Sequence, residues 1–338
     1  MKRKILITGG GGFLGTALIK LLKQNADHEI YSVSRKNYLH LKNEGVSQIQ
    51  HDLSSAGDLE SILPKDIDVV FHTAALAGIW GKKEHFFNIN TEGTLKLVDW
   101  AKKSGVKQFI YTSTPSVVFG KDDLINVDET TPYPDKHLCH YVASKALAEK
   151  YVLQNNSPEM ITCAIRPHLI WGPGDPHLFP RIVEKARQGK LKRVGEGLNQ
   201  VDIVYVDNAA WAHVLAMEAG INAGGKAYFI GQEKPVNLWD FIDTVLKIYS
   251  LPKIEESISM MTAYRLGFLF EKIFEFFGIN QPDPPMTRFV ALNLATSHYF
   301  NQENAFKDLG YKPLISIETG LKLIEQEVKI RKEKIKGF

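Results

Sequence analysis

Apolar residues in the first half of the chain follow two alternating patterns. Short β-branched runs, apolar on both faces, are separated by longer stretches in which apolar residues recur at helical spacing. The short runs predict buried strands at 4–8, 29–34, 47–51, 69–72, 108–112 and 162–166. Because strands and helices alternate, we expect an α/β protein with a doubly wound parallel sheet covered by helices on both faces.

The texture of the chain changes after Pro167. Proline and glycine interrupt the next stretch, a basic helix is expected over 181–189, and the C-terminal part is mostly helical. The pattern therefore predicts a Rossmann-type domain over 1–170, rejoined by 201–232, and a smaller, mostly helical substrate-binding region over 171–200 and 233–330. The basic run that begins at Arg181 fits three roles: attraction of a substrate carboxylate, attraction of a bilayer surface, or a solvated helix face.

Residues 263–279 form the most apolar stretch of the chain, and five of them are phenylalanines. Charged side chains interrupt this stretch, and it is shorter than the roughly 20 apolar residues that span a bilayer. Two interpretations stay open. The stretch is either a buried or lid helix that walls a pocket for a long hydrophobic substrate, or a peripheral membrane contact through Ala263 to Ile279.

Composition and charge narrow the function classes. The chain has 338 residues, of which 44% are hydrophobic and 23% charged, as in an ordinary globular protein. A net charge of +3 is too small to indicate a nucleic-acid partner. Two cysteines, Cys139 and Cys163, make no disulfide framework and no metal-ligand spacing, so no metal is expected. The first apolar run is too short for a signal peptide, which favours a cytoplasmic protein.

A glycine-rich turn directly follows the first predicted strand. In Thr8-Gly9-x-x-Gly12-x-x-Gly15 the glycines permit a tight turn, and the backbone at Phe13 and Leu14 begins the next helix. A helix N-terminus behind such a turn binds the diphosphate of a dinucleotide. The turn therefore predicts a dinucleotide cofactor.

The end of the second strand distinguishes the two nicotinamide dinucleotides. An acidic residue at this point would bind the ribose hydroxyls of NAD, but the sequence has Ser34, Arg35 and Lys36. Two cations can pair with a 2′-phosphate, the arginine in bidentate geometry. We predict NADP(H) as the preferred cofactor, while NAD(H) stays open.

Further cofactor contacts are expected where the third and fourth strands end. Asp52 and Leu53 come just after the third strand and are placed to touch the adenine. Ala74 and Ala75 follow the fourth strand, and their small side chains let the backbone lie against the cofactor. His72, at the end of that strand, is interpreted as structural.

Tyr141 and Lys145 are the candidate proton-transfer pair. Residues four apart lie on one face of a helix, and a cation near a phenol lowers its pKa from about 10. The fifth strand ends in Thr112-Ser113-Thr114, at the carboxyl edge where open α/β sheets bind ligands. A hydroxyl there can hold a substrate carbonyl toward the tyrosine.

These motifs together resemble the extended short-chain dehydrogenase/reductase family over most of the chain. The resemblance implies that Tyr141 is the proton donor and acceptor, and that Lys145 binds the nicotinamide ribose and lowers the tyrosine pKa. It implies that Thr114, with Ser113 as the weaker candidate, orients the carbonyl. It also adds cofactor contacts at Asn90, Thr112, Pro167 and Leu169.

A closer resemblance is to the 3-beta-hydroxysteroid and sterol-4-carboxylate 3-dehydrogenase branch. The motifs are Tyr111 to Val118, Arg166 to Asp175, Gly195 to Asp202 and Gly225 to Ile230. Within that branch, the segments 74–81 and 169–175 are most similar to bacterial 2-alkyl-3-oxoalkanoate reductases. This similarity implies an oxidoreductase that converts a 3-oxo acid into a 3-hydroxy acid with NADPH.

Other readings stay open from the sequence. A 3-beta-hydroxysteroid or sterol dehydrogenase shares the branch, and a nucleotide-sugar epimerase or dehydratase with tightly held NAD shares the scaffold. Arg35 and the phenylalanine-rich stretch argue against the epimerase. A cofactor-sensing protein without activity would be expected to lack Tyr141, Lys145 or the hydroxyl, and all are present. Reaction direction and a homodimer also stay open.

Overall fold

The computed structural model describes residues 2–25, 28–55 and 57–336. Its centre is a seven-stranded sheet with the order β12-β7-β5-β4-β1-β2-β3, in which every pair is parallel. The strands are β1 (Lys4–Thr8), β2 (Glu29–Ser34), β3 (Ser47–Gln50), β4 (Val69–His72), β5 (Gln108–Thr112), β7 (Ile161–Pro167) and β12 (Ala227–Ile230). The α/β fold predicted from the alternating pattern is therefore confirmed. The six predicted strands end within one residue of the expected positions, and β12 is a further strand that was not predicted.

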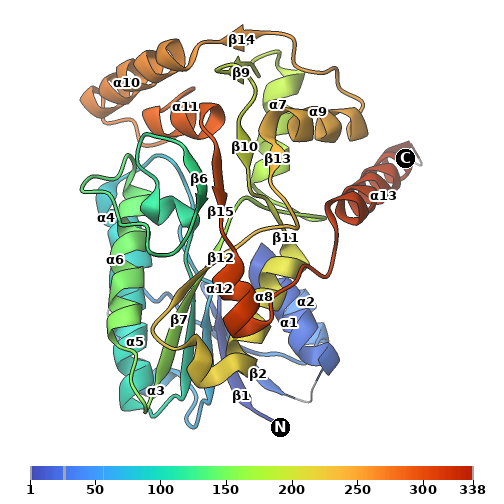
Figure 1. The fold of residues 1–338 in the computed structure, drawn as a ribbon. Helices are drawn as coiled ribbons and strands as arrows, with labels where there is room; N and C mark the ends of the chain where they lie inside the picture. The colour runs from blue at the N-terminus through green and yellow to red at the C-terminus, as the bar shows by residue number, and fades with distance from the viewer. Residues whose placement is uncertain (1, 26–27, 56, 337–338) are drawn as a thin grey trace.

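Helices cover both faces of this sheet (Figure 1). On one face α1 (Phe13–Asn25) packs against α8 (Val206–Ala219), and on the other α5 (Gly93–Lys103) packs against α6 (His140–Gln154). The alternation of side chains along β1 supplies both cores, because Ile5 and Ile7 pack toward α1 while Leu6 joins the core beneath α5. Shorter elements at the sheet margins are α2 (Leu39–Asn43), α3 (Leu59–Ile62), α4 (Lys83–Phe86), the π-helix η1 (Phe87–Glu92) and the 3₁₀ helices η2 (Pro115–Val118) and η3 (Gly220–Ala223).

The second part of the molecule contains small sheets as well as helices. A four-stranded sheet has the order β13-β10-β15-β6, and two further sheets pair β8 with β11 and β9 with β14. Its strands are β6 (Leu124–Val127), β8 (Ile170–Trp171), β9 (Arg193–Val194), β10 (Gln200–Val201), β11 (Val204–Tyr205), β13 (Val236–Asn237), β14 (Ser257–Ile258) and β15 (His298–Phe300). Its helices are α7 (Leu178–Arg187), α9 (Leu238–Ile248), α10 (Met260–Phe276), α11 (Arg288–Ala295) and α13 (Ile317–Lys336). Although it lies in the range 233–330, α12 (Glu303–Leu309) packs against α8, β12 and η3 of the central part.

These sheets depart from the expected domain division at β6 and at β11, which lies inside the range 201–232 but pairs with β8 outside the central sheet. β6 lies inside the range 1–170, yet it pairs with β15 in the small sheet and not with the central one. Strands of two to four residues are too short for a readable alternation, and the partner strand of β6 comes from the far end of the chain. The return of 201–232 is carried by β12, which pairs with β7 at the edge of the central sheet.

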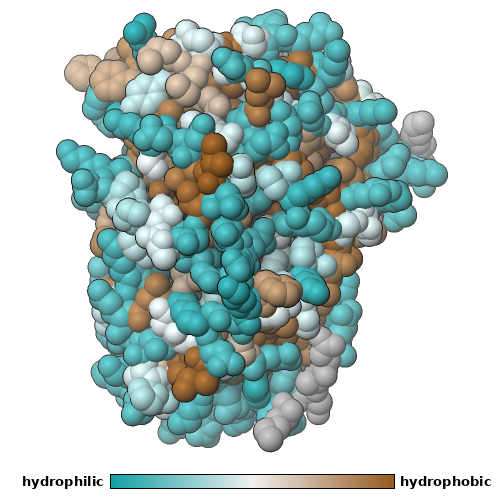
Figure 2. Space-filling model, viewed as in Figure 1, coloured by the Kyte–Doolittle hydropathy of each residue, from teal (hydrophilic) through white to brown (hydrophobic). Residues whose placement is uncertain are grey.

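The phenylalanine-rich stretch forms α10, which is buried only along a narrow stripe. Ala263, Gly267 and Glu271 face α11, and a methyl group at Gly267 would come within 2.6 Å of the backbone of Thr287. Most large apolar side chains of the helix instead face outward, with Phe276 83% exposed. Figure 2 shows the resulting apolar area at the upper left, over α10. The interpretation as a buried helix is therefore wrong for this outer face. No helix within the described ranges is long and apolar enough to cross a membrane.

Candidate active site

A cleft opens at the carboxyl ends of the central strands. It has a volume of about 590 Å³ and is lined by residues that follow β1, β2, β3 and β4. The sheet order places β1 beside β4, so the chain crosses to opposite faces from these two neighbouring strands. Such a switch point is where open α/β sheets bind nucleotides.

The glycine turn forms the floor of this cleft. Gly9 has a positive φ of 73°, and its N–H donates to the carbonyl of Val33 at 2.9 Å. A methyl group at Gly9 would lie 2.9 Å from the backbone of Ala74, and one at Gly15 would lie 2.3 Å from the carbonyl oxygen of Gly9. Only glycine therefore permits this close approach of the turn to β4 and α1. The amino end of α1 directly follows the turn.

Nine residues predicted to bind the cofactor line the cleft: Gly9, Gly12, Ser34, Arg35, Lys36, Asp52, Leu53, Ala74 and Ala75. The structure adds lining residues that the sequence did not single out, among them Tyr38, His51, Ser54, Thr73 and Leu76. The Ser34 hydroxyl and His51 Nε2 are buried without a hydrogen-bond partner. These free polar atoms, the glycine turn and the cleft volume fit a bound dinucleotide.

The end of β2 presents cations and no carboxylate. Arg35 and Lys36 are exposed, and the Lys36 ammonium lies 5.3 Å from the centre of the Tyr38 ring. Across the cleft, Asp52 accepts hydrogen bonds from the Ser54 N–H at 2.9 Å and from its hydroxyl at 2.7 Å. The Ser54 hydroxyl is the main reason why the pKa of Asp52 is lowered, and Arg35 adds to this effect.

The predicted catalytic hydroxyl lies against the predicted catalytic tyrosine. Tyr141 is in the first turn of α6, and Thr114 is the second residue after the end of β5. The Thr114 side chain is near enough to the phenol of Tyr141 to lower its pKa. The hydroxyl of the neighbouring Ser113 is buried and has no hydrogen-bond partner. Of the two candidate hydroxyls, that of Thr114 therefore acts on the Tyr141 phenol, whereas that of Ser113 has no hydrogen-bond partner.

Lys145 lies one turn further along α6 and is fully buried. Its ammonium donates to the backbone carbonyl of Thr112 at 2.6 Å and lies 4.1 Å from the centre of the Tyr111 ring. Burial lowers the pKa of Lys145 to about 7, although the carboxylate of Glu149 opposes that shift. Thr112 thus acts through its backbone, because its side chain hydrogen-bonds His213.

The pKa of Tyr141 differs from the sequence expectation. Burial raises it to about 12, nearby Cys139 adds to the rise, and the Thr114 side chain opposes it. Lys145 was expected to lower this pKa, but its ammonium is engaged by Thr112 and does not offset the burial of the phenol. Tyr141 is therefore a protonated phenol at neutral pH. Burial also raises the pKa of the Cys139 thiol to about 12, which disfavours a thiolate role.

Asn90 connects the cleft to the catalytic helix. It lies in η1, and π-helical turns are frequent at functional sites. Its side chain accepts from the Leu76 N–H at 2.7 Å and donates to the Leu76 carbonyl and to the Ser144 hydroxyl, each at 3.0 Å. Asn90 therefore holds the wall of the cleft against α6 and does not itself line the cleft.

The remaining predicted cofactor residues lie around the cleft without lining it. Phe13, Leu14 and Gly15 belong to the turn and the start of α1, while Pro167 and Leu169 lie at and after the end of β7. Leu169 has a positive φ of 43°, which is uncommon for a residue other than glycine. His72 is buried between the hydroxyls of Thr8 and Thr94, and burial lowers its pKa to about 3, as a structural role requires.

A buried ion pair one helical turn after Lys145 was not predicted from the sequence. Glu149 lies one turn after Lys145 and binds Arg166 of β7 through two hydrogen bonds, at 2.5 and 3.0 Å. The Tyr133 hydroxyl donates to the same carboxylate at 2.5 Å. The pair joins α6 to the central sheet and supplies the negative charge that opposes the fall in the Lys145 pKa. The spacing of four residues from Lys145 was the available signal.

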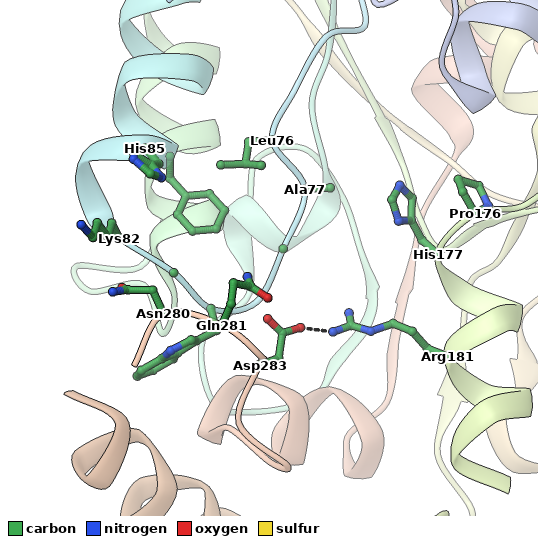
Figure 3. Close-up of a pocket in the computed structure, with 14 residues that line it drawn as sticks. Leu76, Ala77, Lys82, His85, Pro176, His177, Arg181, Asn280, Gln281 and Asp283 are labelled. Atoms are coloured by element: carbon green, nitrogen blue, oxygen red, sulfur yellow. Dashed lines mark hydrogen bonds and ion pairs between the residues drawn. The ribbon is translucent and has the colours of Figure 1, made fainter. Parts of the chain in front are cut away.

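A second cavity adjoins the cofactor cleft. It has a volume of about 490 Å³ and lies between the 76–86 segment, the start of α7 and the segment that follows α10 (Figure 3). Leu76 lines both cavities. Trp80 fixes one wall, because its Nε1 donates to the carbonyl of Ile279 at 2.8 Å and its ring meets Phe274 edge-on. The position of this cavity beside the cleft is that of a substrate pocket.

Comparisons with known proteins agree with this geometry. Residues 6–260 match the 3-beta hydroxysteroid dehydrogenase/isomerase family. The chain is 41% identical over 330 residues to a 2-alkyl-3-oxoalkanoate reductase of Stenotrophomonas maltophilia, covering 95% of this chain and 98% of the relative. It is 39% identical to a protein of the same name from Shewanella oneidensis, covering 94% and 84%. The mouse sterol-4-alpha-carboxylate 3-dehydrogenase is 33% identical, covering 98% and 93%.

Solved structures share the fold at lower identity. A UDP-glucuronic acid 4-epimerase from Bacillus cereus, in complex with NAD, superposes with a TM-score of 0.72 at 23% identity, covering 97% of this chain and 99% of the other. A short-chain dehydrogenase/reductase superfamily protein from Agrobacterium tumefaciens, with bound NAD, gives 0.75 at 17% identity, covering 99% and 100%.

Proposed function

The chain belongs to the 3-beta hydroxysteroid dehydrogenase/isomerase family and is an NAD(P)-dependent oxidoreductase, and from this premise we propose that it reduces 2-alkyl-3-oxo acids to 3-hydroxy acids with NADPH. The observation that carries the proposal is the buried, protonated phenol of Tyr141 on α6, with the Thr114 side chain near enough to act on its pKa. The full-length similarity to two 2-alkyl-3-oxoalkanoate reductases supports the choice of substrate.

The residues divide the work of carbonyl reduction. A bound nicotinamide dinucleotide supplies the hydride that the carbonyl carbon receives. The Thr114 hydroxyl holds the carbonyl oxygen, and Tyr141 gives its phenolic proton to that oxygen as negative charge develops on it. Lys145, held by the Thr112 carbonyl, supplies positive charge one helical turn from Tyr141 as long as the pH stays below its pKa of about 7. Asn90 fixes the cleft wall at Leu76 to Ser144 of α6 through side-chain hydrogen bonds.

Arg35 and Lys36 support NADPH over NADH. Both line the cleft where the adenosine ribose of a dinucleotide would lie, and neither has a carboxylate partner at the end of β2. We expect Arg35→Ser to weaken NADPH binding roughly 10- to 100-fold, the range for one charge-assisted hydrogen-bonded contact, and to leave NADH binding unchanged. Dissociation constants from cofactor fluorescence would show this. Equal losses for both cofactors would contradict the assignment.

A steroid or sterol is the second candidate substrate. The same family includes relatives whose names describe steroid and sterol dehydrogenases, and the apolar wall of the cavity suits ring systems as well as alkyl chains. The higher identity to the 3-oxoalkanoate reductases favours the acid. An epimerase is not favoured, because the similarity to epimerases rests on the fold alone.

A side-by-side assay tests the proposal. Loss of NADPH is followed with 2-alkyl-3-oxo acids of increasing chain length, and gain of NADPH or NADH with 3-beta-hydroxysteroids. We expect turnover with the acids, rising with chain length as more carbon is buried. Turnover with the steroids alone would overturn the substrate assignment and leave the family assignment intact.

A further inference from the structure

The cavity beside the cofactor cleft combines an apolar wall with an excess of positive charge. Leu76, Trp80 and Phe86 contribute the apolar surface. Four side chains that carry or can take up a positive charge also line it: Lys82, His85, His177 and Arg181. Asp283 is the one carboxylate among the described residues of this lining. Even with both histidines neutral, two cations face a single carboxylate, so the cavity favours an anion with an apolar body.

Asp283 is not a free negative charge, because it is paired with Arg181. The arginine comes from the first turns of α7 and the aspartate from the segment after α10, and Figure 3 shows the two side chains meeting. The Arg181 side chain is 53% exposed and that of Asp283 25% exposed. An ion pair this open to water contributes little net stability, since solvent screens it. The arginine can therefore exchange one carboxylate for another at small cost.

The walls of the cavity do not depend on this ion pair. The Lys185 ammonium donates to the carbonyl of Pro285 at 3.4 Å, and Trp80 Nε1 binds the carbonyl of Ile279. These contacts tie α7 and the 76–86 segment to the chain that follows α10. Arg181 can thus release Asp283 while the cavity keeps its shape.

We propose that Arg181 recognises the carboxylate of an apolar acid in this cavity, with Asp283 occupying the arginine until the acid arrives. The inference rests on the proposed function and names the residue that selects the acid. The guanidinium offers a planar pair of N–H donors that matches a carboxylate in bidentate geometry. Leu76, Trp80 and Phe86 then cover the carbon chain, and the Asp283 carboxylate is released to water.

Binding of an acid and of its ester tests this role apart from turnover. The probes are a 2-alkyl-3-hydroxy acid and its methyl ester, titrated calorimetrically into the NADPH-saturated protein, where neither can react. Wild type is expected to bind the acid more tightly than the ester. Arg181→Gln should weaken acid binding roughly 10- to 100-fold, as the loss of a charge-assisted hydrogen bond implies, and leave ester binding unchanged. The affinity of Arg181→Lys for the acid should lie between those of wild type and Arg181→Gln, because lysine keeps the charge but lacks the bidentate geometry.

Two further variants complete the test, the first as a matched control and the second as a probe of the competing carboxylate. Arg187→Gln removes an exposed cation from the other end of α7, outside this cavity, and should change neither affinity. Asp283→Asn removes the competing carboxylate and should tighten acid binding by a few-fold. A loss of acid binding in Asp283→Asn as large as that in Arg181→Gln would contradict the exchange of partners.

The outcomes separate this inference from the proposed function. If the wild type reduces 3-oxo acids but Arg181→Gln weakens the binding of acid and ester equally, the role of the arginine is overturned and the reductase assignment stands. Acid-selective binding through Arg181 without turnover would overturn the reductase assignment and leave the binding site standing. Equal affinity of wild type for acid and ester would overturn the inference outright.

Discussion

At the scale of single residues, the protonation state of Tyr141 determines how each direction of the reaction depends on pH. Its pKa is raised to about 12, so the phenol is protonated and ready to donate across the neutral range. Oxidation of an alcohol needs the phenolate instead. As long as the pH is below the pKa, the phenolate fraction rises about tenfold for each unit by which the pH increases. We therefore expect the rate of 3-hydroxy acid oxidation to climb from pH 6 to pH 9. Ketone reduction should not climb, because Tyr141 stays protonated and Lys145 loses its charge above its pKa of about 7.

Rates measured across that range, with saturating cofactor, check this expectation. An oxidation rate that levels off near pH 7 would place the Tyr141 pKa near neutrality. The lowering of the Tyr141 pKa by Lys145, which the sequence led us to expect, would then outweigh the rise caused by burial. Tyr141→Phe serves as the control, because it has no proton to give or take at this position.

The residue scale also shows what sequence patterns miss. Tyr141, Lys145 and Thr114 could be picked out because motif and spacing mark them, and the structure places Thr114 against the phenol. The hydrogen bond from Lys145 to the Thr112 carbonyl could not be predicted, because a backbone acceptor leaves no mark in the sequence. The direction of the Tyr141 pKa was missed for the same reason, since burial depends on the whole fold.

At the scale of elements, the ion pair between Glu149 and Arg166 joins α6 to β7. Both side chains are almost fully buried, so removing one partner leaves the other charge without compensation. We expect Glu149→Gln to lower the free energy of unfolding by roughly 3–5 kcal/mol, measured by urea denaturation. Glu318→Gln breaks the exposed pair with Lys322 on α13 and should leave the unfolding curve unchanged. Similar curves for both variants would contradict the bracing role of Glu149.

The outer face of α10 is the other element with a testable consequence. Its exposed residues include Phe268, Leu269 and Phe276 together with Arg265 and the ion pair of Lys272 with Glu275, whereas Glu271 is turned inward and paired with Arg288. An exposed apolar face bordered by Arg265 suits the surface of an anionic bilayer. We expect the protein to sediment with phosphatidylglycerol vesicles more than with phosphatidylcholine vesicles.

A triple substitution of serine for Phe268, Leu269 and Phe276 should abolish that sedimentation. Ile221→Ser, which replaces an equally exposed apolar side chain in η3, provides the control and should bind vesicles like the wild type. A second copy of the chain is the competing occupant of this face. Sedimentation velocity showing a dimer that the triple substitution dissociates, without vesicle binding by wild type, would contradict the lipid contact.

At the scale of the whole molecule, the central sheet was predictable and the smaller region was not. Strands that are buried along nearly their whole length, such as β1 and β4, are recognisable as apolar runs, and the glycine turn after β1 marks the expected cofactor edge. The small sheet depends on β6 pairing with β15, which are far apart in the chain, and β6 has no fully buried residue. The exposure of α10 likewise depends on what packs against it. The proposed substrate cavity is lined by segments that are far apart in the chain. The sequence therefore predicts the type of reaction better than it predicts the substrate.

The central claim is that Tyr141 completes an NADPH-dependent reduction of 2-alkyl-3-oxo acids. The most direct measurement compares wild type and Tyr141→Phe for NADPH consumption with one such acid, with NADPH affinity measured separately in both proteins. The account predicts steady consumption by wild type, and a loss of about a hundredfold or more in the variant with NADPH binding retained. Undiminished consumption by a variant that still binds NADPH would contradict it.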